Sequence, residues 1–386
     1  MLYYLPLESY KERYTYQLSA PKIGWLERNW VAEGIPYLRI NGDRPGFSDS
    51  IGTGCVVDAI GRSVFAFSQV SKLLDMAQKG QVKDNDVIYF DDFWTPGVEA
   101  LAYAFHMLGI KPRMYAQCWA QSVDEYDFTY GMRDWIRPFE RGIGQVLSGI
   151  FVCSSILKDL LVQGGVASAD KIFVTGLPYA SDEVATRLPL QPLPRLKQVA
   201  YSSRFDSEKN PHFYMDVVER VIASRPEARF VICTGSAVLR SNDDSAVPRL
   251  RRLAALHPDN VIIREGLTKE QYYEELSQSR IQFNTADQDF VSWTLLEAAQ
   301  CGCYPIYPQF RSFPEALRGQ PAFMYRPKSV VSASNAIISV LDSDGSLWDA
   351  EAIASRDWIY RTHDYAWRRM YDHMMQRPQL CYPLHP

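Results

Sequence analysis

Short apolar segments alternate with longer amphipathic segments along almost the whole chain. Residues 86–90 and 198–202 are strand-like runs, whereas 98–108 and 211–223 carry apolar residues at helical spacing. Strands that alternate with helices in this way are typical of doubly wound parallel sheets. The pattern therefore predicts an α/β fold.

A proline-rich segment divides the chain. Residues 188–195 read LPLQPLPR, and spaced prolines favour a stiff, extended connector over regular structure. The α/β pattern occurs on both sides of it, and the length of 386 residues suits two domains better than one core. We therefore expect a first domain at 1–187, a linker at 188–195, a second domain at 196–355, and a C-terminal helix and tail at 356–386.

The composition excludes several classes of protein. Of the residues, 47% are hydrophobic and 22% are charged, and no apolar run approaches the roughly 20 residues that cross a bilayer. Residues 1–7 lack the basic start of a signal peptide, and seven scattered cysteines indicate neither a disulfide framework nor a zinc site. The net charge of -4 argues against a uniformly basic polyanion binder. We therefore expect a reduced, cytoplasmic protein.

Residues 287–302, DQDFVSWTLLEAAQCG, contain a helix start that follows a predicted strand. Ser292 is of a type favoured at the N-cap, and the helix is expected over 293–300, ending at Gly302. Unbonded backbone N–H groups and a partial positive charge at such a helix start favour phosphate binding. The segment therefore predicts an anion site.

Two carboxylates flank this anion site. Asp289 lies in the loop before the helix, and Glu297 lies on the helix with a side chain that leans back toward its start. They could accept hydrogen bonds from the hydroxyls of a sugar nucleotide. In the alternative interpretation, Asp289 only complements the helix dipole and Glu297 is solvated.

Two cations precede another helix of the same domain. The segment SSRFDSEKN, 202–210, supplies Arg204 and Lys209 at the carboxyl end of a predicted strand. Cations at the carboxyl end of this strand would face the same crevice as the predicted anion site, where they would neutralise a diphosphate leaving group. The alternative is a solvated turn in which Glu208 and Lys209 form a local charge pattern.

Several segments of the C-terminal half resemble one family in order and content. Asp289 and Glu297 are separated by seven residues, and Arg204 and Lys209 by four. These two pairs are accompanied by four further segments: REGLTKEQYYEEL (264–276), EAAQCGCYPIYP (297–308), RSFPEAL (311–317) and THDYAWRRMYDHM (362–374). As a set they resemble the retaining two-domain glycosyltransferases of the glycogen-synthase and sucrose-synthase type. The resemblance implies a GT-B fold, in which two Rossmann-like domains face each other across a cleft and a C-terminal helix crosses back to the first domain.

The resemblance also implies roles for residues of the second domain. Arg204 and Lys209 would hold the diphosphate of the donor. Glu297 would bind the ribose hydroxyls, and Asp289 would lie against the hydroxyls of the donor sugar. The other donor-binding residues, the first two of them against the nucleobase, would be Gly266, Leu267, Phe290, Val291, Ser292, Trp293 and Thr294.

The chain departs from the family pattern in places. Asp289 stands where Glu is usual, and Phe290 and Ser292 replace the glycines usual in that loop, which would narrow the pocket. The family often places a first-domain histidine near the hydroxymethyl group of the sugar, but the segment MYAQCWAQS has none. A pentose donor is therefore one interpretation. Three residues of this segment could occupy the histidine position: Gln117, Trp119 and Gln121.

The resemblance implies that the anomeric configuration is retained, because the acceptor attacks on the face from which the phosphate departs. The donor is expected to be a nucleotide sugar, with UDP as the expected nucleotide. Catalysis would rest on positioning and on stabilising the phosphate charge, with a diphosphate oxygen accepting the acceptor's proton. We nominate no general base, and we expect no metal or other cofactor, because two cationic side chains and a helix dipole take the place of the metal.

The N-terminal domain would bind the acceptor. Residues 7–25 interleave Lys11, Arg13 and Lys22 with aromatic residues that include Tyr14. Basic and aromatic side chains together suit contacts to phosphates and bases. This segment therefore predicts a nucleic-acid acceptor, despite the slightly acidic chain.

A further segment, YFDDFWTPGVEAL at 89–101, makes the first domain similar to bacteriophage glycosyltransferases. Some of these modify hydroxymethylated pyrimidines in DNA, so we expect Asp92 and Trp94 near such an acceptor. The target base would be exposed or flipped so that its hydroxymethyl oxygen reaches the donor. A phage-encoded protein would act in the host cytoplasm.

Other interpretations stay open. The acceptor could be a bacterial glycan or a small molecule, and a catalytically silent module that only binds sugar nucleotides would carry the same residues. A dinucleotide-dependent oxidoreductase, suggested by GTGCVVDAIG at 52–61, is discounted because the third glycine is displaced and no convincing strand precedes it. The sequence identifies neither the sugar nor the oligomeric state.

Overall fold

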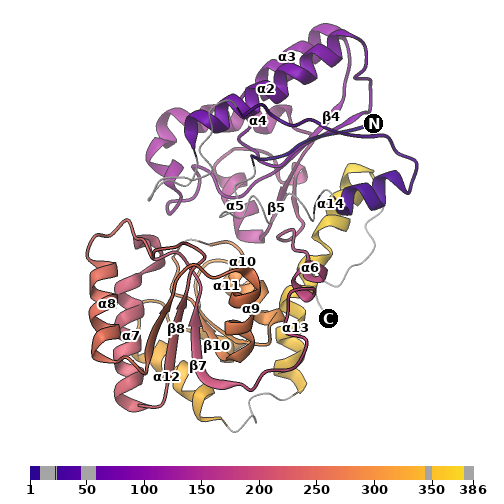
Figure 1. The fold of residues 1–386 in the computed structure, drawn as a ribbon. Helices are drawn as coiled ribbons and strands as arrows, with labels where there is room; N and C mark the ends of the chain where they lie inside the picture. Colours follow the sequence, from indigo (N-terminus) through magenta and orange to yellow (C-terminus); the bar gives the residue numbers. More distant parts are fainter. Residues whose placement is uncertain (9–21, 23, 45–57, 288, 344–349, 378–386) are drawn as a thin grey trace. The chain divides into compact units, whose positions relative to one another are not determined.

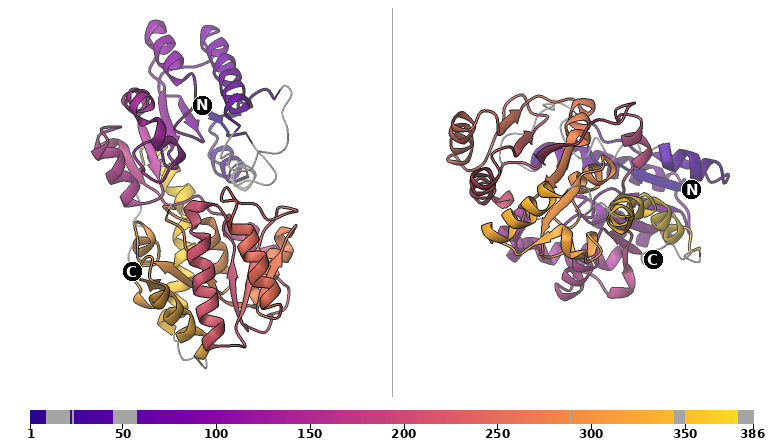
Figure 2. Two further views of the ribbon diagram at one scale, coloured as in Figure 1. Left: turned by 90° about the vertical axis from the view of Figure 1, so that its left-hand side faces the viewer. Right: turned by 90° about the horizontal axis from the view of Figure 1, so that it is seen from below.

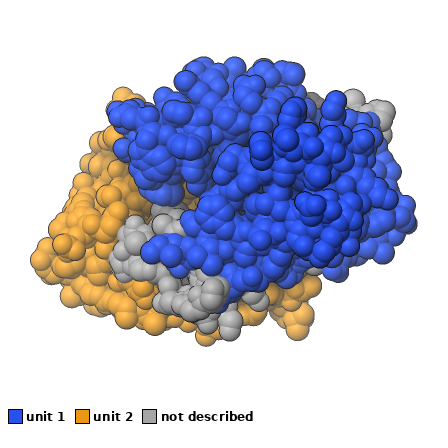
Figure 3. All heavy atoms as spheres, turned by 90° about the horizontal axis from the view of Figure 1, so that it is seen from above, with its two compact units in different colours: residues 1–178, 365–386 blue, residues 179–364 orange. Residues whose placement is uncertain are grey.

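Two parallel sheets of six strands each organise the part of the chain that the structure describes. The computed structural model describes residues 1–8, 22, 24–44, 58–287, 289–343 and 350–377. The chain forms two compact units, Met1–Pro178 with Tyr365–Pro386 and Tyr179–Asp364, which Figure 3 colours separately. The predicted α/β fold class is confirmed in both.

The N-terminal unit has the strand order β2-β1-β3-β4-β5-β6, and all neighbouring strands are parallel. Its elements can be followed in Figure 1. In chain order they are β1 (Leu2–Leu5), η1 (Glu27–Val31), β2 (Tyr37–Arg39), α2 (Ala59–Gln78), β3 (Val87–Phe90), α3 (Val98–Leu108), β4 (Arg113–Gln117), η2 (Phe128–Met132), α4 (Arg133–Val146), β5 (Gly149–Val152), α5 (Ser155–Gln163), η3 (Ala169–Lys171), β6 (Ile172–Val174) and α14 (Ala366–Met374).

The inner strands of this sheet are apolar because both faces are covered. β1, β3 and β5 are buried at every position, as expected for a parallel sheet with helices on its faces. One face packs on α14, whose Met370, Tyr371 and Met374 share a core cluster with Leu2 and Tyr4. The last helix therefore belongs to the first unit, which confirms the predicted return of the chain; it is yellow in Figure 2.

Lys22 lies in the interior of the N-terminal unit. Its side chain is 0% exposed and forms an ion pair with Asp91, which also accepts a hydrogen bond from Tyr4 Oη. The ammonium group lies 5.1 Å from the centre of the Trp367 ring of α14. Burial lowers the pKa of Lys22, and Asp91 opposes this effect. The prediction that Lys22 contributes to a basic acceptor surface is therefore wrong, because its ammonium group is buried and paired with Asp91 within the core.

The C-terminal unit has the strand order β12-β11-β10-β7-β8-β9. Figure 1 shows α7, α8 and α12 on one side of this sheet and α9, α10 and α13 on the other. The elements are α6 (Ser181–Ala185), β7 (Leu196–Tyr201), η4 (Ser207–Lys209), α7 (Pro211–Ser224), β8 (Arg229–Cys233), α8 (Ala246–Leu256), β9 (Val261–Arg264), α9 (Lys269–Gln278), β10 (Ser279–Phe283), α10 (Trp293–Gln300), β11 (Tyr304–Pro308), α11 (Phe313–Ala316), η5 (Pro321–Phe323), β12 (Met324–Tyr325), α12 (Val330–Asp342) and α13 (Ala350–Asp364).

Local sequence signals set the ends of these helices. Thr268 and Gln271 form a capping box at the start of α9, in which each side chain bonds the backbone of the other residue. Pro211 occupies the first turn of α7, where its missing N–H costs nothing. Gly302 follows α10 with φ of +86°, a conformation that a side chain would strain.

The two units meet in sequence at Pro178 and Tyr179. Tyr179 Oη donates a hydrogen bond to Gln300 Oε1 over 2.6 Å, so this part of the chain already packs with the C-terminal unit. Residues 179–187, which were expected in the first domain, thus belong with the second, and so does the expected linker at 188–195.

Among the residues that the structure describes, no helix combines the length and apolar character that a membrane span requires. Five cysteines of these residues are buried: Cys118, Cys153, Cys233, Cys301 and Cys303.

Candidate functional site

The strand order of the C-terminal unit places a reversal point between β7 and β10. From β7 the chain proceeds to β8 and β9 on one side, and from β10 it proceeds to β11 and β12 on the other. In open parallel sheets, ligands bind outside the carboxyl ends of the strands at such a point, because the two loops diverge there. The loops that lead from β7 to α7 and from β10 to α10 therefore define the candidate site.

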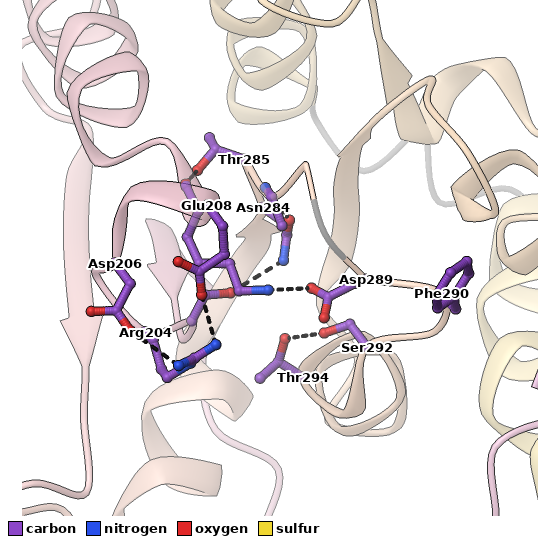
Figure 4. Close-up of polar contacts among 12 residues, drawn as sticks. Arg204, Asp206, Glu208, Asn284, Thr285, Asp289, Phe290, Ser292 and Thr294 are labelled. Atoms are coloured by element: carbon purple, nitrogen blue, oxygen red, sulfur yellow. Dashed lines mark hydrogen bonds and ion pairs between the residues drawn. The ribbon is translucent and has the colours of Figure 1, made fainter. Parts of the chain in front are cut away.

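An ion pair bridges these two loops. Lys209 Nζ lies 3.1 Å from a carboxylate oxygen of Asp289, and the lysine side chain is only 7% exposed. Figure 4 shows the Asp289 carboxylate pointing toward the loop that carries Arg204 and Glu208. The structure thus brings together two predicted donor-site residues that are far apart in the sequence.

Three hydrogen bonds to backbone carbonyls, two of them from side chains, hold the same two loops together. Thr285 Oγ1 donates to the Lys209 carbonyl over 2.5 Å, and Asn210 Nδ2 donates to the Thr285 carbonyl over 2.8 Å. The Asp287 N–H donates to the Glu208 carbonyl over 3.0 Å. The ion pair therefore lies on segments with little freedom to separate.

Arg204 is oriented by two acidic residues that were not assigned a role from the sequence. Its Nη1 lies 3.1 Å from Asp206 Oδ2, and its Nη2 lies 2.6 Å from Glu208 Oε1. Asp206 also accepts a hydrogen bond from the backbone N–H of Asn242 over 2.9 Å. Glu208 lies four residues after Arg204, but the segment is a loop that leads into a short turn (Ser207–Lys209) and not an α-helix, so this spacing did not reveal the contact. The Arg204 side chain is 42% exposed, so it is accessible to a ligand.

The start of α10 borders the ion pair. The helix runs from Trp293 to Gln300, as predicted, with Ser292 at the N-cap position. The Ser292 side chain makes no capping hydrogen bond; its Oγ lies 2.7 Å from Thr294 Oγ1 instead. The first turn therefore presents two hydroxyl groups beside its positive end, a combination suited to phosphate oxygens.

Phe290 does not narrow the space around Asp289. Figure 4 shows its ring pointing away from the polar cluster, and the residue is 5% exposed. The Arg311 guanidinium lies 4.6 Å from the ring centre, and Ser312 Oγ donates to the Phe290 carbonyl. The expectation that Phe290 constricts the pocket is therefore wrong, since its side chain packs away from it. The neighbouring Val291 is partly buried.

Glu297 is buried on α10 and paired. Its side chain is 4% exposed, and Oε1 accepts hydrogen bonds from Lys269 Nζ over 2.7 Å and from Tyr273 Oη over 3.0 Å. The alternative in which Glu297 is a solvated helix residue is therefore wrong. Lys269 and Tyr273 were not predicted, although both lie within REGLTKEQYYEEL.

Gly266 and Leu267 form the turn between β9 and α9. Gly266 has φ of +68°, which favours glycine. Its N–H donates to the Ser236 carbonyl over 2.8 Å, and the Leu267 N–H donates to the Thr234 carbonyl over 3.1 Å. These two amides hold the loop after β8, so a nucleobase would have to contact other atoms of the turn.

Asp92 and Trp94 lie at the carboxyl end of β3 in the N-terminal unit. Asp92 forms an ion pair with Arg62, which also pairs with Glu8 over 3.0 Å. Burial raises the pKa of Asp92 to about 6, although Arg62 acts in the opposite direction. The Trp94 ring packs edge-on against Phe139 at 6.4 Å between ring centres. Neither Glu8 nor Arg62 was predicted to be part of this cluster.

The residues at the expected histidine position are mostly covered. Gln117 is 0% exposed and Gln121 is 8% exposed. Trp119 is partly buried, and its Nε1 donates to the Asp91 carbonyl over 3.0 Å. Trp119 therefore offers the largest accessible surface of the three.

The remaining acceptor-site predictions, Lys11, Arg13 and Tyr14, lie outside the described residues. Within the described part of the chain, no three His, Cys, Asp or Glu side chains are grouped so that they could hold a metal ion.

Comparison with known proteins connects this site to a family. Residues 191–358 match the family Glycosyl transferases group 1. The tRNA-queuosine alpha-mannosyltransferase of Drosophila melanogaster is 27% identical over 139 residues, which are 36% of this chain and 33% of the fly protein. The match therefore spans about a third of that relative's length.

Two solved structures share the fold over nearly the whole chain. Sucrose-phosphate synthase from Thermosynechococcus elongatus has a TM-score of 0.66 at 14% identity, with 97% of this chain and 98% of that chain covered. An alpha,alpha-trehalose-phosphate synthase (UDP-forming) from Burkholderia vietnamiensis has a TM-score of 0.64 at 11% identity, with the same coverage of 97% and 98%. The chain therefore has the fold of the GT-B glycosyltransferases, and the family match at residues 191–358 lies within its C-terminal unit.

Proposed function

We propose that this chain is a retaining glycosyltransferase that moves a sugar from a nucleotide donor to a hydroxyl group of a modified nucleoside in a nucleic acid. The observation that carries the proposal is the Lys209–Asp289 ion pair of 3.1 Å at the β7/β10 reversal point. Arg204 lies on one side of this pair and the start of α10 on the other. Within a domain that matches glycosyltransferases, this grouping suits a sugar diphosphate.

The donor would be held at both of its ends. Arg204, Lys209 and the first turn of α10 would bind the diphosphate, because all three supply positive charge or hydrogen-bond donors. Asp289 would accept hydrogen bonds from the donor sugar, and Glu297 would accept them from the ribose. UDP is our preferred nucleotide, since the similarly folded synthase from Burkholderia vietnamiensis is UDP-forming by name.

The reaction would rest on stabilising the leaving group. The bond between the anomeric carbon and the diphosphate oxygen breaks, and its electron pair leaves with the diphosphate. The acceptor oxygen bonds to the anomeric carbon on the same face, and its proton passes to the departing diphosphate oxygen. Cationic side chains that are already held in place stabilise the charge of the leaving diphosphate without having to reorganise during the reaction. We assign no side chain as general base and invoke no metal.

The favoured acceptor is the hydroxymethyl group of a 5-hydroxymethylpyrimidine in phage DNA. The name of the fly relative adds a second nucleic-acid acceptor, queuosine in tRNA. Both are hydroxyl groups on a modified nucleoside, and an enzyme would reach either one only when the base is exposed or flipped. The cluster of Asp92 and Trp94 at the end of β3 would lie at the acceptor.

The test is a panel of donors and acceptors. Purified protein is incubated with UDP-glucose, UDP-N-acetylglucosamine, UDP-xylose or GDP-mannose, each with hydroxymethylcytosine DNA, hydroxymethyluracil DNA, queuosine tRNA or the unmodified nucleic acids. Mass spectrometry of the nucleosides should find a sugar on one modified base and none on the unmodified controls.

Two other results would redirect the proposal. Donor turnover that needs a glycan or a small molecule would replace the nucleic-acid acceptor with that class. Nucleotide binding without turnover on any acceptor would favour a module that binds sugar nucleotides and is catalytically silent.

A further inference from the structure

Lys269 lies beside the carboxylate that the proposed function assigns to the ribose. It is the first residue of α9, and its Nζ is 2.7 Å from Glu297 Oε1. The glutamate is 4% exposed, whereas the lysine side chain is 35% exposed. The charge of Glu297 is thus paired in the interior by a cation that still reaches solvent.

The position of this ammonium group is fixed by its surroundings. The Thr268–Gln271 capping box sets the start of α9 directly before it. The ammonium lies 5.1 Å from the centre of the Tyr272 ring and 5.5 Å from that of Tyr273, distances at which aromatic faces attract a cation. Lys269 therefore does not resemble a freely moving surface lysine.

From this geometry we infer that Lys269 and Glu297 together select a ribonucleotide donor over a 2′-deoxyribonucleotide donor. The inference rests on the proposed function, because it takes the nucleoside to lie against Glu297. A carboxylate only accepts hydrogen bonds and an ammonium group only donates them, whereas each hydroxyl of a ribose diol does both. A diol can therefore satisfy both side chains, and a deoxyribose leaves one of them without its ligand partner.

Because Glu297 is buried, the lack of the hydrogen bond that a deoxyribose cannot make should lower the binding affinity of a deoxyribonucleotide. A buried charged group that loses a hydrogen-bond partner costs more than an exposed one, because water does not replace the partner. We therefore expect the wild-type protein to bind UDP about 10- to 100-fold more tightly than 2′-deoxy-UDP. The sequence segment REGLTKEQYYEEL carries the lysine two residues after Leu267, on the same turn that is expected to contact the nucleobase.

The test compares four proteins by calorimetric titration with UDP, 2′-deoxy-UDP, GDP and 2′-deoxy-GDP. K269M should bind the ribonucleotides more weakly and lose most of the preference over the deoxy forms. K269R keeps the charge and should retain part of the preference. The matched control is K197M, whose lysine pairs with Glu227 over 2.9 Å at the other end of β7 and should behave as wild type.

A further variant separates selection from mere structural support of Glu297. Y273F removes the other hydrogen bond to Oε1 without removing the cation, so it should keep the ribose preference even if all affinities fall. An unchanged ribose preference in K269M, with its thermal unfolding close to that of wild type, overturns the inference. Wild-type protein that binds none of the four nucleotides overturns the proposed function and this inference with it, whereas wild-type binding without a ribose preference overturns only the inference.

Discussion

Lys209 and Asp289 form an ion pair of 3.1 Å between loops that follow neighbouring strands of the C-terminal sheet. In the proposed reaction, the Lys209 ammonium group would bind the phosphate of the donor and the Asp289 carboxylate would bind its sugar. The pair also keeps each side chain oriented, because Lys209 is 7% exposed and has little room to move.

Removal of the Lys209 charge should abolish most of the transfer. We expect K209M to lower the rate of sugar transfer by about 100- to 1,000-fold, the usual cost of losing one positioned group that stabilises the leaving charge. Steady-state kinetics with the active donor measures it, and K197M is the matched control because Lys197 also pairs with a carboxylate, that of Glu227, away from the site. A K209M rate within a few-fold of wild type would remove Lys209 from the site.

Arg204 should matter for activity but not for folding. Its side chain is 42% exposed, so R204A should leave the unfolding temperature near that of wild type while transfer falls by a factor of about 100. R225A is the control, since Arg225 forms a comparable exposed pair with Asp342. D206N should show a smaller loss than R204A, because Glu208 still holds the guanidinium group. Equal activity of R204A and R225A would argue against a phosphate contact.

Phe290 should contribute to stability and not to the shape of the donor pocket. F290A removes a buried ring that lies under the Arg311 guanidinium, and we expect it to lower the free energy of unfolding by about 3 kcal/mol. Urea unfolding measures this loss, and the KM for the donor should stay within about twofold of wild type. A large change in KM with unchanged stability would place the ring in the pocket after all.

The pH dependence of stability should report on Asp92. Burial raises its pKa from 3.8 to about 6, so the folded protein binds this proton more tightly than the unfolded chain does. The resulting stabilisation is complete below the unfolded pKa and is lost as the pH rises through the folded pKa. Relative to D92N, the free energy of unfolding of the wild type should therefore fall by roughly 3 kcal/mol between about pH 4 and about pH 7. Urea unfolding of both proteins across this range checks it, and parallel pH profiles would contradict the raised pKa.

Much of the fold follows from the sequence because parallel strands are continuous apolar runs. β3 and β7 lie where the runs 86–90 and 198–202 predict them, since burial on both faces leaves no polar alternation to confuse the pattern. The boundary between the two units was harder to predict from the sequence. Residues 179–187 join the C-terminal unit through contacts such as Tyr179 with Gln300, which no local pattern reveals.

The candidate site was predictable in part for a similar reason. Residues at the ends of strands, such as Lys209 and Asp289, meet because topology brings their loops together. The partners of those residues depend on side-chain directions across elements, as in the contact of Lys269 with Glu297. Lys22 illustrates the opposite error, because a basic residue among aromatic ones is typical both of a nucleic-acid surface and of a buried cation packed on rings.

The packing of α14 into the first unit affects the order in which the protein can form on the ribosome. The N-terminal unit takes Met370 and Tyr371 into the same core as Leu2 and Tyr4, so that core stays incomplete until translation has passed those codons. The C-terminal unit is continuous from Tyr179 to Asp364 and can close earlier. The N-terminal unit is therefore synthesised first but completes its core last. The apolar face of its sheet that packs on α14 needs protection until then.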